Sequence, residues 1–418
     1  MRRAFLLSLL LLSAYPPAAS AADYVPGEVL VHDAAGTRIV ATPGGHSVRW
    51  TAGHLRERAG VDWAVPNYLA HAAQEFVPND PGTGSGWQAM QWNFLPGIGV
   101  DAPGAWTNLI RAGRPGGSGV VVAVIDSGVA YENRGRFRLS PDFSPRQFAA
   151  GYDFVDDDNH PDDELGHGTF VAGTIAERTN NGRALTGLAY GARIMPVRVL
   201  DRDGVGDAET IGKGIRWAAN HGAQVINLSL VFDSSEHASD IPPIIHALRY
   251  AHRRRVTVVG ASGNDSGRVV AYPAHAGDVI SVGATTQQGC LASYSNTGKG
   301  LDLVAPGGGD NAVTPGDPNC QGGFEPGLPI FQLTYPHDGQ VRRFGYPDDY
   351  EGTSFSAPHV AAAAALVVAS GVIGRRPSPA AILHRLRTTS RDMGTPGDDT
   401  SFGAGMLDAA AATAPSGT

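Results

Sequence analysis

The sequence is poor in lysine and in long apolar runs, and each shortage excludes a class of function. Lys213 and Lys299 are the only lysines among 418 residues, and 40 acidic residues outnumber 32 basic ones. The net charge of −8 provides no basic footprint for nucleic acid, so we expect no nucleic-acid partner. The later apolar runs, such as residues 361–368, are too short to span a bilayer, so we expect no membrane anchor.

Cysteine is nearly absent as well. Cys290 and Cys320 are the only two cysteines. In an exported chain an even pair favours one disulfide, with two unpaired thiols as the alternative. The 55 glycines and 29 prolines indicate many loops, while a hydrophobic content of 42% is ordinary and supports a large core.

The N-terminus has the organisation of a secretory signal. Arg2 and Arg3 precede the apolar run 5–12, and residues 19–21 are small, as a cleavage site requires. We therefore assign residues 1–21 to a signal peptide and expect a secreted protein, either extracellular or periplasmic.

Residues 22–76 differ in texture from the rest of the chain. Residues 25–31 and 61–69 have strand character, and residues 54–59 have the composition of a short helix. Such a segment is small for a domain that is stable alone. A turn-rich stretch, residues 79–86, follows it. We therefore place a boundary near residues 76–80 and assign residues 77–418 to the main domain.

Strands and helices alternate in the main domain. Residues 120–125 are almost all β-branched, which is typical of a strand buried on both faces. This alternation predicts an α/β fold with a mostly parallel sheet that helices cover on both sides. We expect further strands at 194–200, 225–230, 256–259, 279–282 and 301–304, and helices at 208–221 and 241–253.

Polar residues stand where expected strands end or helices begin. Asp126 directly follows the strand 120–125, and Asn264 follows the strand 256–259. His167 lies between two glycines at the start of a helix. In a parallel sheet, sites form at the carboxyl ends of the strands. Each residue alone is more typical of a turn or a structural contact, so the argument depends on their combination.

Ser354 lies in a tight turn, residues 352–354, that leads into an Ala-rich helix ending at Gly371. Free N–H groups and the helix dipole at such an N-terminus favour a developing oxyanion. Ser354 is therefore a candidate nucleophile if a base lies near, and a simple helix cap is the alternative.

The order Asp126, His167, Asn264, Ser354 resembles that of the subtilisin-like serine protease family. The blocks 126–128, 166–169 and 352–359 match that family's signatures, and the resemblance extends over about residues 76–412. It implies a three-layer subtilisin-like fold, with a mostly parallel sheet, preceded by a small α+β propeptide. It also implies a monomeric serine endopeptidase that is made as a zymogen and acts on proteins or peptides.

The resemblance also implies a role for each site residue. Ser354 attacks the peptide carbonyl, and His167 takes its proton and later passes it to the leaving amine. Asp126 orients the imidazole. Asn264 and the Ser354 backbone N–H form the oxyanion hole. The implied substrate-binding residues are Gly204, Val205, Gly206, Ser229, Leu230, Val231, Ala261, Ser262 and Gly263, of which the first six pair with extended substrate.

Three positions depart from the family's pattern. Phe170 and Phe355 stand where the family usually has His and Met, and neither change removes a catalytic group. Val231 stands where many relatives have Gly beside the specificity pocket. We expect it to narrow the pocket mouth and to favour small or medium apolar residues before the cut.

The segment 151–164 carries seven carboxylates. A solvated acidic loop is one interpretation. A calcium site is the other, because acidic residues spaced within turns can form an oxygen-rich cage. The resemblance to thermitase-like members implies carboxylate ligands from Asp153, Asp156, Asp158 and Asp162, and a backbone carbonyl from His160. A second calcium site is implied at Asp142, Gln91 and Asn181.

The resemblance gives the N-terminal segment a function as well. It implies that residues 22–76 are a propeptide, which assists folding and blocks the site until it is cleaved, and we expect cleavage within residues 71–79. Residues 308–350 form a surplus loop before Ser354, and its position suggests a wall of the substrate cleft.

Two other functions are compatible with parts of the sequence. An α/β-hydrolase esterase is disfavoured because the segment 352–356 lacks the second glycine of that fold's nucleophile turn and the order of catalytic residues differs. A calcium-stabilised binding scaffold without catalysis remains the alternative, although the sequence lacks no member of the triad.

Overall fold

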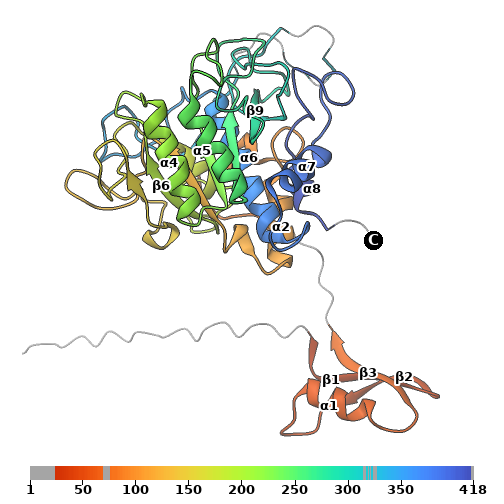
Figure 1. Cartoon of the computed structure of the whole chain (residues 1–418). Helices are drawn as coiled ribbons and strands as arrows, with labels where there is room; N and C mark the ends of the chain where they lie inside the picture. The colour runs from red at the N-terminus through yellow and green to blue at the C-terminus, as the bar shows by residue number, and fades with distance from the viewer. Residues whose placement is uncertain are drawn as a thin grey trace, which may run out of the picture. The chain divides into compact units, whose positions relative to one another are not determined.

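The computed structural model describes residues 24–68, 76–313, 317–318, 320, 322 and 327–415. It divides into two compact units, residues 1–74 and 75–418 (Figure 1). The expected signal peptide, residues 1–21, and residues 71–75 of the expected cleavage region lie outside the described residues.

The first unit is a three-stranded antiparallel sheet with one helix. Its strand order is β2-β1-β3, and Val29, Val31 and Ala64 of the sheet pack against Ala52 and Leu55 of the helix. The elements are β1 (Tyr24–Asp33), β2 (Gly36–Ala41), α1 (Val48–Arg56) and β3 (Val61–Tyr68).

Our prediction from the sequence placed the helix of this unit too late and did not include the strand β2. The helix begins at Val48 and not at residue 54, because the Ser47 side chain accepts a hydrogen bond from the Trp50 amide and caps it there. The strand β2 was not expected. It lies at the edge of the sheet with no fully buried residue, so it carries little of the apolar alternation by which strands are recognised.

The second unit is built on a seven-stranded sheet in the order β10-β9-β8-β7-β4-β6-β5, and every ladder in it is parallel. The expected parallel sheet is thus confirmed, with strand ends shifted by a few residues. The strands are β4 (Val121–Asp126), β5 (Tyr152–Asp153), β6 (Arg193–Arg198), β7 (Val225–Leu228), β8 (Thr257–Ala261), β9 (Val279–Thr285) and β10 (Leu303–Pro306).

Helices cover both faces of this sheet and make three layers (Figure 1). One face carries α3 (His167–Ala176) and α6 (Thr353–Ser370), and the other carries α4 (Ala208–Asn220) and α5 (Pro242–Arg253). Alternate residues of β4 point to the two layers: Val122 and Val124 pack with α3 and α6, while Ala123 and Ile125 pack with α4 and α5. Smaller helices are α2 (Ala102–Arg111), α7 (Pro379–Thr389) and α8 (Ala409–Thr413).

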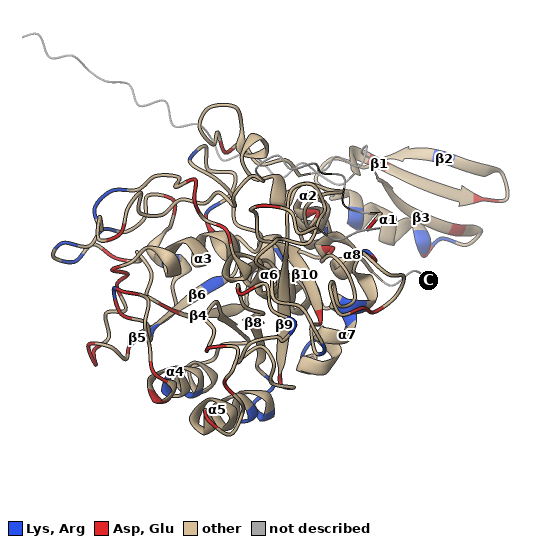
Figure 2. Ribbon diagram, turned by 90° about the horizontal axis from the view of Figure 1, so that it is seen from above, with Lys and Arg blue, Asp and Glu red and all other residues tan. Residues whose placement is uncertain are grey.

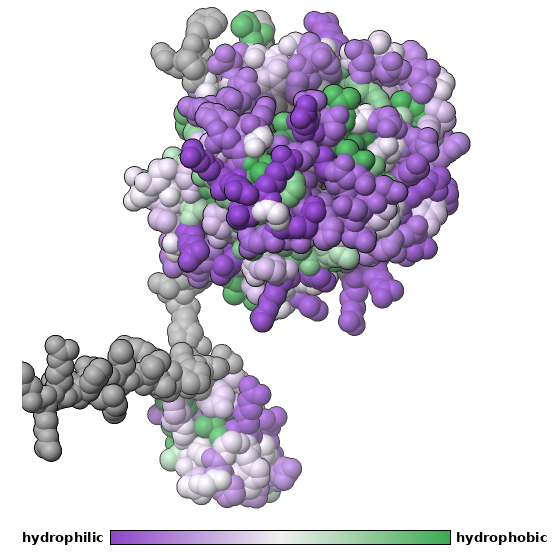
Figure 3. Space-filling model, turned by 90° about the vertical axis from the view of Figure 1, so that its left-hand side faces the viewer, coloured by the Kyte–Doolittle hydropathy of each residue, from purple (hydrophilic) through white to green (hydrophobic). Residues whose placement is uncertain are grey.

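The helix α6 runs through the core behind the nucleophile candidate. It begins at Thr353 and ends at Gly371, whose φ of 71° gives the left-handed C-cap expected from the sequence. By length and composition α6 could cross a membrane, but 78% of it is buried inside the unit, as in the core helix of a folded domain. On the face shown in Figure 3, apolar residues gather in small patches within a mostly hydrophilic surface.

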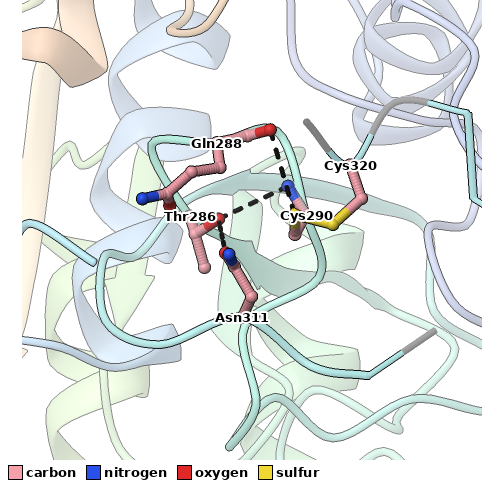
Figure 4. Close-up of a disulfide and its surroundings, with 5 residues drawn as sticks. All are labelled: Thr286, Gln288, Cys290, Asn311 and Cys320. Atoms are coloured by element: carbon pink, nitrogen blue, oxygen red, sulfur yellow. Dashed lines mark hydrogen bonds between the residues drawn. A yellow bond between two sulfur atoms is a disulfide. The ribbon is translucent and has the colours of Figure 1, made fainter. Parts of the chain in front are cut away.

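The two cysteines form the expected disulfide, Cys290–Cys320. It joins the turn after β9 to the surplus loop 308–350, beside a hydrogen bond from the Thr286 hydroxyl to Asn311 (Figure 4). The later part of that loop packs inward, with Ile330, Leu333 and Tyr335 buried. The covalent link at Cys320 and the apolar packing of residues 330–335 attach these described parts of the loop to the domain.

Candidate active site

Asp126 ends β4, between the neighbouring strands β6 and β7. Its side chain is fully buried. One carboxylate oxygen, Oδ1, accepts hydrogen bonds from the Ser127 amide and from Nδ1 of His167, both at 2.7 Å. The buried carboxylate therefore holds the imidazole in one orientation with Nε2 directed away from it.

His167 is the first residue of α3, and the glycines on both sides of it permit the backbone conformation and the close packing that this place in the fold requires. Gly166 has a φ of 109°, which other residues rarely adopt. A Cβ at Gly168 would overlap the Gly128 carbonyl oxygen. Only glycine lets α3 approach β4 so closely, and that approach brings the imidazole to Asp126.

Asp163 organises the turn before His167, and sequence reasoning gave it no role. It is fully buried and accepts five hydrogen bonds, from the side chains of Ser127 and Thr169 and from the backbone amides of Leu165, Gly166 and Thr169. The Thr169 hydroxyl bond, at 2.6 Å, and the Ser127 hydroxyl bond, at 2.9 Å, tie β4 to α3. Asp163 is a positioning residue for the Asp126–His167 pair.

The pKa of His167 is raised above its ordinary value. Burial alone would lower it by disfavouring the imidazolium, but the charge and hydrogen bond of Asp126 outweigh burial. A neutral imidazole is needed for a base, so activity should appear as the pH rises through this raised pKa.

Ser354 and Asn264 meet at the N-terminus of α6. The Asn264 side-chain oxygen accepts hydrogen bonds from the Thr353 amide at 2.9 Å and from the Thr353 hydroxyl at 2.8 Å. Because its oxygen is held, the Asn264 amide nitrogen is left to donate. The Ser354 hydroxyl donates to the Ser229 carbonyl at 3.2 Å, and among the described residues no hydrogen bond joins it to His167. Catalytic hydrogen bonds are often long without substrate and tighten on binding.

Two cavities meet at His167 and Ser354. The first has a volume of about 390 Å³ and contains the expected substrate-binding segments 204–206 and 229–231. The second, of the same volume, lies on the side of Asn264 and Phe355. The expected substrate residues Ala261, Ser262 and Gly263 are buried behind Asn264 and line neither of these cavities.

Residues 117–405 match the model of the family described as "Subtilase family". The chain belongs to the subtilase family. It is 36% identical to "Subtilisin BL" of Lederbergia lenta over 326 residues, which cover 78% of this chain and 99% of that protein. It is 35% identical to the "Thermophilic serine proteinase" of Bacillus sp. strain AK1 over 74% of this chain, and it spans 64% of the length of that protein.

Solved structures agree with the family. The structure titled "Proteases from Pseudoalteromonas arctica PAMC 21717" matches with a TM-score of 0.64 and 30% identity, covering 81% of this chain and 99% of that one. The structure of "a cold adapted subtilisin-like serine proteinase" matches with a TM-score of 0.54 and 28% identity over 70% of this chain and 89% of that one. The three-layer subtilisin-like fold is confirmed, and this subtilase is a serine endopeptidase that acts on protein substrates.

The two aromatic departures from the family pattern contact each other. The Phe170 and Phe355 rings lie 4.7 Å apart, and both pack on Tyr350 at the end of the surplus loop, at 4.6 and 5.1 Å. Trp92 and Ile330 complete this cluster. A long loop brings an aromatic residue to the site, and two phenylalanines pack against it.

Phe355 predicts resistance to oxidation. Its ring centroid lies 5.3 Å from that of His167, so a sulfur at this position would become a polar sulfoxide beside the Asp126–His167 pair when it is oxidised. We expect the wild type to keep more activity after peroxide treatment than Phe355→Met, measured as residual peptide hydrolysis. Equal losses in the two proteins would contradict the expectation.

The acidic loop 151–164 does not form the expected calcium cage. Arg198, at the end of β6, is buried and places its guanidinium against Asp153 at 2.9 Å, Asp156 at 2.7 Å and Glu164 at 3.1 Å. Arg134 likewise pairs with Asp162 at 2.7 Å. Figure 2 shows the basic segment of β6 and the acidic stretches of the loops around the sheet.

The remaining ligands expected in this loop are also engaged elsewhere. Asp158 accepts a hydrogen bond from the His160 amide at 2.7 Å, and the His160 carbonyl, the expected ligand atom, accepts one from the Asp162 amide at 2.6 Å. Among the described residues, no three acidic, His or Cys side chains converge in metal-binding geometry. Guanidinium groups therefore pair with three of the expected ligands, Asp153, Asp156 and Asp162, while Oδ1 of Asp162 has no hydrogen-bond partner in the described part of the chain.

A second acidic cluster lies around Asp142. Asp142 and Glu177 are fully buried, and Oδ2 of Asp142 and both carboxylate oxygens of Glu177 lack a hydrogen-bond partner among the described residues. Burial raises the pKa of Asp142 to about 7. The negative charge of Asp80 raises this pKa further, whereas the hydrogen bond from the Asn181 amide lowers it. Burial, Asp142 and Asp80 also raise the pKa of Glu177.

Sequence reasoning identified only part of this cluster. Asp142 and Asn181 belong to it, joined by a 2.5 Å hydrogen bond, but Gln91 does not, because its amide is fully engaged with Thr186 and Gln332. Asp80 lies in a stretch that we interpreted as a linker, and Glu177 follows a helix of apolar residues. A single ionisable residue directly after a buried apolar helix is unusual, and this position could have indicated that Glu177 is buried.

Proposed function

We propose that this subtilase hydrolyses peptide bonds through a triad of Asp126, His167 and Ser354, with Asn264 in the oxyanion hole. The observation that carries the proposal is the 2.7 Å bond from His167 Nδ1 to the buried Asp126 carboxylate, with Ser354 in the same cavity. The binding scaffold without catalysis requires a broken triad, and this arrangement gives no support for one.

In the proposed reaction, the Ser354 hydroxyl leaves the Ser229 carbonyl and bonds His167 Nε2. The oxygen attacks the scissile carbonyl as its proton passes to Nε2, and Asp126 stabilises the imidazolium. The Asn264 amide and the Ser354 N–H donate to the oxyanion, and one such donor contributes about 3–4 kcal/mol. The imidazolium then gives its proton to the leaving amine as the C–N bond breaks, which leaves the acyl group as an ester on Ser354. Water then attacks this ester with His167 as the base, and the ester bond breaks to release the acid product and the free Ser354 hydroxyl.

We further propose that the protein is exported as a zymogen, with residues 22–76 as its propeptide, and that the mature enzyme is monomeric. Three strands with a small core support an independently folded segment. The experiment is expression of the full chain with export. The wild type should lose the residues before about position 77, as seen by N-terminal mass spectrometry. Ser354→Ala should lose only the signal peptide and retain residues 22–76, and equal processing of both proteins would exclude self-cleavage.

We propose that calcium stabilises the domain through the unpartnered Oδ2 of Asp142, with Asp80 and Glu177 adding negative charge nearby; in the described part of the chain the three side chains do not form a converged carboxylate cluster. Unpartnered buried carboxylate oxygens fit a hard cation, which prefers oxygen ligands. The loop 151–164 fits it less well, because Arg198 and Arg134 pair with Asp153, Asp156 and Asp162 and leave only Oδ1 of Asp162 buried without a hydrogen-bond partner among the described residues of the loop.

Removing calcium should therefore lower the stability of this subtilase. A chelator is expected to reduce the Tm of the mature protein by about 5–10 °C, since a bound ion stabilises the folded state by mass action. Asp142→Asn should abolish the fall in Tm caused by the chelator. Asp156→Asn, which changes a carboxylate that pairs with Arg198, should leave that fall in Tm unchanged. An unchanged Tm with chelator in the wild type would contradict the calcium proposal.

Val231 should limit the size of the substrate side chain that is accepted directly before the scissile bond. It lines the first cavity and is 42% exposed, at a position where its side chain can narrow the entrance. We expect small or medium apolar residues to be preferred, and Val231→Gly to improve phenylalanine relative to alanine by about tenfold in kcat/KM. A wild-type peptide-library profile led by large aromatics or by arginine would contradict this.

A further inference from the structure

The second cavity at the active site receives the part of the substrate that follows the cut. The first cavity contains the segments 204–206 and 229–231, which in the proposed function pair with the chain before the scissile bond. The second shares only Leu165, His167 and Ser354 with it and extends past Asn264 and Phe355. A peptide whose carbonyl lies at Ser354 must therefore continue into the second cavity on its leaving-group side.

This cavity is strongly acidic. Asp338, Asp349 and Glu351 line it, and all three are exposed. None of the three forms an ion pair with a Lys, Arg or His in the described part of the chain, and no Lys or Arg among those residues lines the cavity. Asp310 adds negative charge beside Glu351. The carboxylates are thus free to meet a charge brought by the substrate.

The floor of the cavity is aromatic. Tyr350 and Phe355 line it, and Phe170 packs behind them, so both rings are held in place. An apolar floor under an acidic rim suits a side chain with an aliphatic stem and a cationic end. Such a side chain covers the rings with its stem and keeps its charge at the rim. Cations also interact favourably with aromatic faces.

The surplus loop supplies two of the three carboxylates and one of the two aromatic rings that line this cavity. Asp338, Asp349 and Tyr350 belong to it, and it is fixed to the turn that holds His167. The Thr334 hydroxyl donates to the Gly166 carbonyl at 2.5 Å, and the Tyr335 hydroxyl donates to the Asp163 carbonyl at 3.2 Å. The acidic rim is therefore anchored relative to the catalytic histidine.

We propose that this subtilase selects substrates with lysine or arginine at the first or second position after the scissile bond and disfavours aspartate and glutamate there. The proposal rests on the proposed function, because it takes Ser354 as the point of cleavage.

The test uses internally quenched peptides that are identical except for Lys, Gln or Glu at these two positions. At low ionic strength the mature wild type should cleave the Lys peptide about tenfold faster than the Glu peptide in kcat/KM. Because the carboxylates are exposed, the ratio should fall below about threefold in 0.5 M salt, where charges are screened. This salt dependence needs no variant.

A matched pair of variants assigns the effect. The double variant Asp349→Asn with Glu351→Gln should remove most of the Lys-to-Glu ratio. Asp240→Asn alters an exposed carboxylate that lines neither cavity and should leave the ratio unchanged. Equal cleavage of all three peptides by the wild type, or a preference that survives the double variant, would overturn the proposal. Failure to cleave any peptide, with no labelling of Ser354, would instead refute the proposed function.

Discussion

Ser354→Ala is expected to lower kcat by about 10⁶-fold, because no other group in the site can form the acyl-enzyme. His167→Ala should cost about as much, and the double variant no more than either single one, because the residues act as a unit. The measurement is kcat for a chromogenic peptide under single-turnover and steady-state conditions.

Ser356→Ala is the matched control. It removes a hydroxyl from the same helix two residues further on, where Ser356 is buried against Gly307 and outside both cavities. Its kcat should stay close to the wild-type value. Additive losses in the double variant would contradict a joint role of Ser354 and His167.

Asp126→Asn is expected to lower kcat by about 10⁴-fold near neutral pH, although the shape of the residue is kept. An amide can donate to His167 Nδ1, which places the proton on Nε2, where a base must accept one. The fully buried position of Asp126 prevents water from taking over its role.

The same substitution should move the pH profile. Asp126 raises the pKa of His167, so the wild-type kcat/KM should rise with pH along a limb above the usual histidine pKa. Without that charge, burial dominates and lowers the pKa, so the limb should shift to lower pH. A limb at the same pH in both proteins would show that another group titrates.

The sequence predicted the parts of the site that local motifs encode. Asp126, His167, Asn264 and Ser354 each follow a strand or begin a helix, and the parallel sheet brings those ends together. The β-branched run 120–125 was sufficient to predict the central strand. By contrast, β2 at a sheet edge buries too little to leave a pattern.

The charged loops could not be predicted from their sequences. The carboxylates of residues 151–164 suit calcium by spacing, but their partners, Arg198 and Arg134, lie in other segments of the chain. Asp80 and Asp142 lie about 60 positions apart in the sequence but interact electrostatically in the folded domain. Their proximity therefore becomes visible only in the tertiary structure. The acidic rim likewise depends on how residues 334–350 attach to the turn before His167.

One measurement tests the central claim most directly: mass spectrometry of the mature secreted protein after reaction with a serine-reactive fluorophosphonate. The proposed triad predicts a single adduct on Ser354, absent in Ser354→Ala, on a chain that lacks the residues before about position 77. A folded, processed chain without an adduct would contradict it and favour a binding scaffold without catalysis.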